Sequence, residues 1–401
     1  MKKRIMAILL AAVVVFGTAA CGGSTGGSGG GADSGSGGDA ASGDMQIAMI
    51  TDSGDITDQS FNQTTYESCK KWSEDNGMEF NYYRPESDSD EARNAAVDLA
   101  IAEGANVVVM PGYMFAAAVV EQSGTYPDVK FIALDLSAGD ICEKGVGEGY
   151  TYNPDDYDVT EYYNTDNTYC CTYQEEISGY LAGYAAVKLG YKHLGFLGGM
   201  SVPAVQRYGY GFVQGANAAA EELGNAGDIT IEYVYGGQFF GDADITAAMD
   251  TWYGTKDVEV VFACGGGIYT SAAEAAEKVG GKVIGVDSDQ SPTIDEYAEG
   301  MTVTSAMKGL GATINTVLSG IKDGKWDSDF AGKIDNLGVI SDTPTENYVQ
   351  LPSTTQWADG FTEDDYTELV KAIHAGDVKI SNDTSAMPKV SVTVNDYGSI
   401  K

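Results

Sequence analysis

From residue 46 onward, short apolar runs alternate with segments whose apolar residues recur at the spacing of an amphipathic helix. The first part of this pattern predicts strands at 46–50, 78–84, 107–110 and 130–134, with helices at 59–76, 91–103 and 115–123. Short apolar strands alternating with helices are typical of a parallel sheet with right-handed crossovers. We therefore expect an α/β fold.

The alternation is interrupted at 137–176, where the sequence is acidic, rich in tyrosine and poorly periodic. It then resumes with predicted helices at 177–189, 205–223, 245–253 and 271–279, and strands at 193–197, 229–235, 258–263 and 282–286. The same series thus occurs twice, which predicts two doubly wound parallel-sheet lobes with a ligand cleft between them. The Tyr-rich stretch 150–173 is best explained as a solvated insertion; a lid and a partner surface are the alternatives.

The chain of 401 residues is longer than one hydrophobic core usually supports, so two domains are expected. We place the N-terminal lobe at 45–175 and the C-terminal lobe at 176–304. Part of 305–401 would complete the first lobe, and part of 320–401 the second.

The first 44 residues indicate where the protein is located. A basic start precedes an apolar run at 5–16, which is too short to span a membrane but typical of a secretory signal at 1–20. Cys21 follows this signal and begins a Gly/Ser-rich tether, 21–44. This order resembles a bacterial lipoprotein signal, so we expect a lipid on Cys21 and a body anchored on the outer (extracellular or periplasmic) side of the cell membrane. Thr18 stands where such signals usually carry leucine, which supports the alternative of a plain secretory signal.

The formal net charge of −36 disfavours nucleic acid and phosphate-rich ligands and favours neutral or cationic ones. The chain has only two histidines and no C-x-x-C, so we expect no metal site. Gly265–Gly267 is not followed by the Gly-Lys-Ser/Thr of a phosphate loop, and we expect no cofactor. Cys142 could pair with Cys170 or Cys171, whereas Cys69 and Cys264 have the pattern of core residues.

Ligands of open α/β sheets bind at the carboxyl ends of the strands. In this chain the predicted strand ends are Asp52, Gly112, Asp135, Gly198, Gly265 and Asp287.

Four segments near these ends share an order with a known family: residues 52–62 (DSGDITDQSFN), 195–212 (GFLGGMSVPAVQRYGYGF), 284–290 (IGVDSDQ) and 304–308 (TSAMK). From residue 45 to about 321 the chain resembles the basic membrane protein family of bacterial surface lipoproteins. The resemblance implies a type I periplasmic-binding fold. It also implies a nucleoside receptor that supplies an ABC importer through its permease.

The resemblance further implies roles for individual residues. Phe61 and Tyr208 would stack on the two faces of a base, and Gly266, Asp287 and Lys308 would hold the sugar. The remaining expected ligand residues are Asp52, Asp58, Asn62, Asp135 and, at the rim, Tyr113. This chemistry suits a nucleoside, because each stack contributes about 1–3 kcal/mol and carboxylates accept hydrogen bonds from ribose hydroxyls or ring N–H groups.

Simpler explanations exist for several of these residues. Phe61 could be a core residue, and Asp58 could only cap a helix. Tyr210 or Phe212 could stack in place of Tyr208. Lys308 could only close a helix or pair with Asp287.

We expect a receptor for a purine nucleoside and not an enzyme, since G-x-S-x-G occurs only within the Gly/Ser-rich tether and no H-E-x-x-H or Walker sequence is present. One alternative is a receptor for a sugar or another small polar ligand. Others are a surface sensor or adhesin without transport, and a nucleoside hydrolase using Asp52 and Asp287.

Overall fold

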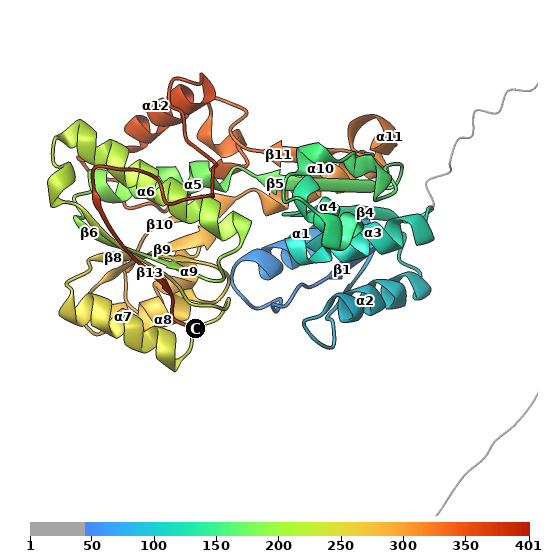
Figure 1. Ribbon diagram of the computed structural model, residues 1–401, viewed down its shortest axis with the longest axis horizontal. Helices are drawn as coiled ribbons and strands as arrows, with labels where there is room; N and C mark the ends of the chain where they lie inside the picture. Colours follow the sequence, from blue (N-terminus) through green and yellow to red (C-terminus); the bar gives the residue numbers. More distant parts are fainter. Residues whose placement is uncertain (1–44) are drawn as a thin grey trace, which may run out of the picture. The chain divides into compact units, whose positions relative to one another are not determined.

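The computed structural model describes residues 45–401. The predictions of a signal, a lipidated Cys21 and a tether concern residues outside this range. Within it, two sheets form the centres of two lobes (Figure 1).

Sheet 1 has the order β11-β5-β4-β3-β1-β2, and all its strands run parallel. Its strands are β1 (Gln46–Ile50), β2 (Glu79–Tyr83), β3 (Val107–Pro111), β4 (Lys130–Leu134), β5 (Thr168–Tyr173) and β11 (Ile334–Leu337). The helices of this lobe are α1 (Phe61–Asn76), α2 (Asp90–Ala102), α3 (Ala116–Thr125), α4 (Ala138–Val146), α10 (Leu310–Lys322) and α11 (Trp326–Asp329). The strands β3 and β4 are almost entirely apolar and buried, because helices cover both faces of the sheet.

Sheet 2 has the order β12-β10-β9-β8-β6-β7-β13, and only β12 runs antiparallel to its neighbour. Its strands are β6 (His193–Gly198), β7 (Thr230–Tyr235), β8 (Val260–Cys264), β9 (Lys282–Asp287), β10 (Thr302–Lys308), β12 (Val349–Gln350) and β13 (Thr393–Ser399). Its helices are α5 (Glu175–Lys188), α6 (Pro203–Leu223), α7 (Ala243–Thr255), α8 (Tyr269–Glu277), α9 (Ser291–Ile294) and α12 (Glu363–His374). These two parallel-sheet lobes confirm the predicted fold class.

The chain passes between the sheets after β5, after β10 and after β11. Two of these passages lead directly into helices, α5 at Glu175 and α10 at Leu310. The lobes are therefore covalently joined at one side of the interlobe region, next to the ends of β5 and β10.

The helices α5 and α6 of the second lobe pack with their backbones in contact. A Cβ added to Gly183 would lie 2.9 Å from the carbonyl carbon of Phe212, and one added to Gly215 would lie 2.7 Å from that of Tyr180. Only glycine permits this approach. The contact fixes the beginnings of both helices, which carry Glu175 and Arg207, relative to each other.

The segment 137–176 differs from its prediction. It contains the helix α4, which begins at a Ser137–Asp140 capping box, and the strand β5, which lies inside sheet 1 between β4 and β11. The proposed insertion therefore cannot extend to residue 173. Its exposed part consists of short turns between α4 and β5.

The cysteines of the described residues are all free and buried: Cys69, Cys142, Cys170, Cys171 and Cys264. The possible disulfide of Cys142 with Cys170 or Cys171 is therefore not formed. Cys69 and Cys264 lie in the core as expected. Burial raises the pKa of all five thiols.

Candidate functional site

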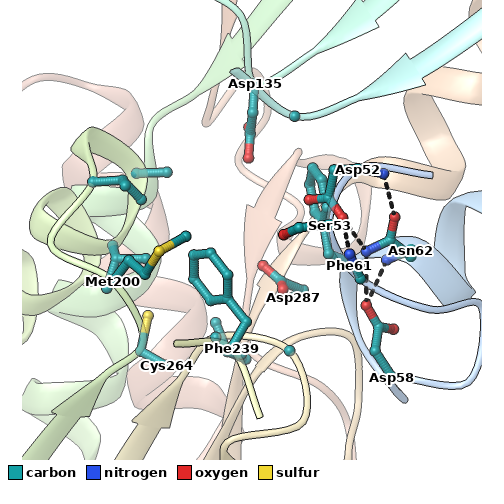
Figure 2. A pocket seen from close by; sticks show the side chains of 18 of the residues that line it. Asp52, Ser53, Asp58, Phe61, Asn62, Asp135, Met200, Phe239, Cys264 and Asp287 are labelled. Atoms are coloured by element: carbon teal, nitrogen blue, oxygen red, sulfur yellow. Dashed lines mark hydrogen bonds between the residues drawn. The ribbon is translucent and has the colours of Figure 1, made fainter. Parts of the chain in front are cut away.

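A cavity of about 770 Å³ lies between the lobes and is lined by residues from both (Figure 2). All ten residues expected at a ligand site line it: Asp52, Asp58, Phe61, Asn62, Tyr113, Asp135, Tyr208, Gly266, Asp287 and Lys308. Of the predicted strand ends, Gly112 and Gly265 also line it. The sequence pattern therefore located residues that the fold brings together, and their contact with a ligand stays a prediction.

The beginning of α1 holds two carboxylates in place. Asp58 accepts hydrogen bonds from the backbone N–H groups of Ser60 and Asn62, each at 2.9 Å, so it does cap the helix. The side-chain amide of Asn62 donates to Asp52 Oδ1 at 2.9 Å and to Asp58 Oδ2 at 3.1 Å. Asn62 is buried and thereby orients both acids (Figure 2).

Asp52 follows β1 at the wall of the cavity. Burial raises the pKa of its carboxyl to about 6. The hydrogen bonds from Gly54 N–H and the Asn62 side chain act in the opposite direction, because they favour the carboxylate. Both of these bonds reach Oδ1. None of the hydrogen bonds among residues 45–401 uses Oδ2, which leaves this oxygen available to a ligand.

A buried network of charges lies beside the ends of β5 and β10. Lys308 Nζ lies 2.6 Å from Asp135 Oδ2, 3.2 Å from Glu175 Oε1 and 3.9 Å from Asp287 Oδ1. Arg207 Nε donates to Glu175 Oε2 at 2.6 Å. Although burial opposes it, the carboxylates raise the pKa of Lys308 above its usual value. Lys308 therefore stays charged, and its nearest partner is Asp135 and not Asp287.

The carboxyl of Asp135 has an oxygen that no described residue satisfies. Oδ2 accepts from Lys308, whereas the buried Oδ1 has no hydrogen-bond partner among residues 45–401. Burial raises the pKa of this group, with Glu175 and Asp287 adding to the effect and Lys308 opposing it. Asp135 and Asp287 end corresponding strands of the two lobes, and both have left-handed backbones with φ of 56° and 63°. Such a conformation is unusual for a residue with a side chain and is concentrated at functional sites.

The two aromatic residues predicted to sandwich a base differ in exposure. Phe61 is half-buried at the beginning of α1. Tyr208 is only 2% exposed, its hydroxyl donates to Asp287 Oδ1 at 3.3 Å, and its ring packs edge-on against Phe262. Lys308 Nζ lies 5.1 Å from the Phe61 ring and 5.5 Å from the Tyr208 ring. Tyr208 thus closes the cavity wall from within the core of the second lobe.

Phe239 is one of three aromatic residues of the cavity lining that sequence reasoning missed, together with Phe240 and Tyr269. It lies in the loop after β7, and its ring points into the cavity from the second lobe while Phe61 approaches from the first (Figure 2). The neighbouring glycines make room for it, because a Cβ on Gly199 or Gly265 would lie 2.6 or 2.8 Å from ring carbons of Phe239. A usable signal existed, since two adjacent phenylalanines follow the end of a predicted strand.

Gly266 and Tyr113 occupy turns at the cavity wall. Gly266 has φ of +50°, and a Cβ there would lie 2.9 Å from the carbonyl oxygen of Phe239, so the loop requires glycine at this position. Tyr113 follows Gly112 at the end of β3 and is half-buried. Met200 and Arg207 also line the cavity and were not predicted.

The described residues hold no group of three or more His, Cys, Asp or Glu side chains arranged for a metal ion. In the same range, no helix has both the length and the apolar character needed to cross a membrane.

Residues 45–343 match the model of a family described as ABC transporter substrate-binding protein PnrA-like. The chain belongs to this family. The family assignment confirms the resemblance that the four sequence segments indicated, and the PnrA-like family is one of binding proteins and not of enzymes.

Two curated relatives are similar to this PnrA-like chain over most of their length. The ABC transporter nucleoside-binding protein BmpA of Lactococcus lactis is 26% identical over 349 residues, covering 81% of this chain and 87% of the relative. Basic membrane protein B of Borreliella burgdorferi is 25% identical over 320 residues, covering 78% and 82%. Among solved structures, an ABC transporter solute-binding protein from Aeropyrum pernix superimposes with a TM-score of 0.61 at 19% identity, covering 85% of this chain and 88% of that one. This last likeness supports the type I periplasmic-binding fold.

Proposed function

We propose that this protein binds a purine nucleoside between its lobes and delivers it to an ABC-type importer. The observation that carries the proposal is the pair Phe61 and Phe239, which face one cavity from opposite lobes. A flat base between two such rings gains stacking energy only when the lobes are closed. The nucleoside-binding name of the Lactococcus lactis relative supports the same ligand class.

The polar groups of the cavity suit the rest of a nucleoside. Asp287 and Lys308 would hold the sugar hydroxyls, and Asp135 Oδ1 supplies a buried acceptor without a partner in the described residues. Asp52 Oδ2 is a further acceptor for a ring N–H. The many carboxylates repel phosphate, so a nucleoside is favoured over a nucleotide.

The ligand is tested by titrating purified protein with inosine, guanosine and adenosine, and with ribose and galactose as controls. Mass spectrometry of the small molecule that co-purifies with the protein identifies the natural ligand. We expect binding of at least one purine nucleoside. Binding of a free sugar without binding of any nucleoside would contradict the proposal and favour the sugar receptor.

The stacking role of Phe239 is tested with a matched pair of variants. Phe239→Ala removes the ring and should raise the Kd for the nucleoside about 10- to 100-fold, as expected for one stacked base. Phe239→Tyr keeps the ring and should stay within a few-fold of the wild type. Equal affinities of the wild type and Phe239→Ala would remove Phe239 from ligand contact.

We also propose that Cys21 carries a lipid that holds the protein on the outer side of the cell membrane. Wild-type protein should incorporate an alkyne-tagged fatty acid and fractionate with membranes, and Cys21→Ala should do neither. Equal labelling of both would show that the lipid is elsewhere.

Delivery and catalysis are tested separately. Cells that lack the protein should take up the labelled nucleoside more slowly than wild-type cells, and unchanged uptake would favour a sensor. Inosine incubated with the protein should stay intact, whereas release of hypoxanthine would support the hydrolase alternative.

A further inference from the structure

In the turn before α1, Gln59 makes contacts across the boundary between the lobes with residues that do not line the cavity. Gln59 lies two residues before the start of α1 and is itself absent from the cavity lining. Its φ of 57° places it in the left-handed region, which is unfavourable for a residue other than glycine. Such a conformation persists only where surrounding contacts compensate for it.

Three hydrogen bonds from the second lobe reach Gln59. Its carbonyl oxygen accepts from Ser288 Oγ at 3.1 Å and from Gln290 Nε2 at 3.0 Å. Its side-chain Oε1 accepts from Thr293 Oγ1 at 3.0 Å. One residue of the first lobe is thus bound at three points by the segment from the end of β9 to α9.

The partners of Gln59 are themselves fixed. Gln290 is 1% exposed; its Oε1 accepts from Val286 N–H at 2.9 Å, and its own N–H donates to Ser305 Oγ at 3.1 Å. The next residue of the turn, Ser60, is fully buried and donates to Asp287 Oδ2 at 2.6 Å. The second lobe therefore offers a rigid surface to the turn.

We propose that Gln59 is a positioning residue whose three hydrogen bonds hold the two lobes together in the closed state; these three bonds are called the latch. In this role it sets the distance of Asp58 and Phe61 from Asp287 without touching the ligand. Lobes joined by a few chain segments close by hinge motion, and opening would break the three bonds together. The inference rests on the proposed function for its effect on affinity, but the latch itself acts with or without a ligand.

The test uses Thr293, whose side chain contributes one latch bond and lies outside the cavity lining. Thr293→Val is nearly isosteric and removes the hydroxyl, and Thr293→Ser retains it. The first measurement is the radius of gyration of each ligand-free protein by small-angle X-ray scattering. The second is the association and dissociation kinetics with inosine, or with the purine nucleoside that binds best, by stopped flow.

We expect Thr293→Val to increase the ligand-free radius of gyration and to accelerate dissociation about 3- to 10-fold, the effect of one net hydrogen bond. Thr293→Ser should match the wild type in both measurements. The association rate should change little, because the latch forms after the encounter. A thermal melt confirms that both variants fold.

The latch is refuted if Thr293→Val leaves both the scattering and the dissociation rate unchanged. It is equally refuted if Thr293→Ser shows the same losses as Thr293→Val, since packing and not the hydroxyl would then be responsible. A failure of the wild type to bind any nucleoside would refute the proposed function instead, and the scattering comparison would still decide on the latch.

Discussion

Replacing Gly215 by alanine tests whether the backbone contact of α5 and α6 supports the binding site. The added Cβ would overlap the carbonyl oxygen of Tyr180 and would lie 2.7 Å from the carbonyl carbon and 2.8 Å from the Cα of the same residue. All three atoms belong to the backbone of α5, so no side chain can rotate to make room. The helices must move apart along their common contact.

Two opposing effects determine the free energy of unfolding of Gly215→Ala. Alanine favours an internal helix position over glycine by about 1 kcal/mol. Overpacking a close contact costs about 1–3 kcal/mol, and a backbone that cannot yield belongs at the upper end. The expected result is a net loss of about 2 kcal/mol.

The matched control is Gly254→Ala in α7. Its Cβ would meet no atom within 4 Å, and its backbone does not have a positive φ. Because Gly254 lies in the last turn of α7, the control should gain less from helix propensity than the roughly 1 kcal/mol of an internal position. Urea unfolding followed by circular dichroism compares the two variants with the wild type.

Gly215→Ala should also weaken nucleoside binding, because the N-terminal parts of α5 and α6 carry Glu175 and Arg207 of the charge network beside the cavity. Gly254→Ala should bind as the wild type does. If Gly215→Ala is as stable as Gly254→Ala and binds equally well, the helices can separate freely, and the reasoning from backbone contact is wrong.

Lys308→Met leaves the carboxylates around Lys308 without their cation and should lower the free energy of unfolding by about 3–5 kcal/mol at pH 7. Part of this stability should return at acid pH, where the carboxyls take up protons, and urea unfolding at several pH values measures it. Burial raises the pKa of Asp52 to about 6 from 3.8, so its contribution to stability falls as the pH rises from about 4 to 6 and is constant above. Asp52→Asn should therefore gain stability over the wild type across this range, by at most about 3 kcal/mol, and a constant difference would contradict the shifted pKa. Glu232→Gln should weaken the packing of β13 against β7, because the buried Glu232 carboxylate accepts hydrogen bonds from four side chains, two of them on β13. Faster amide hydrogen exchange along β7 would support this, whereas unchanged exchange would show that the backbone hydrogen bonds alone hold β13 on β7.

The sequence predicts the buried parallel strands well. The bounds of β1 and β4 agree with the prediction, because a strand covered on both faces is apolar over nearly its whole length; only the first residue of each is polar. It fails for β5, whose residues Thr168–Tyr173 contain no aliphatic side chain and follow an acidic, Tyr-rich stretch. It also fails for β13, which is largely exposed at the edge of sheet 2 and carries polar residues.

In the candidate site, too, some residues can be predicted from the sequence and others cannot. Residues at strand ends, such as Asp52 and Asp287, are predictable because the topology of a parallel sheet brings these ends to one edge. Which aromatic ring faces the cavity depends on the path of a loop, which the periodicity does not report. Tyr208 lies on the inner face of α6 and Phe239 on an irregular loop, so only the packed structure distinguishes their exposures.

The five buried cysteines have a practical consequence. A thiol reacts as its thiolate, and burial makes the thiolate rare and inaccessible in every cysteine between residues 45 and 401. Within residues 45–401, a cysteine introduced on the surface of each lobe would therefore react selectively with a fluorescent dye while the five buried ones stay in place. With one dye on each lobe, the distance between the dyes would report the opening of the lobes in single-molecule measurements. The same labelled protein could serve as an optical reporter of its ligand.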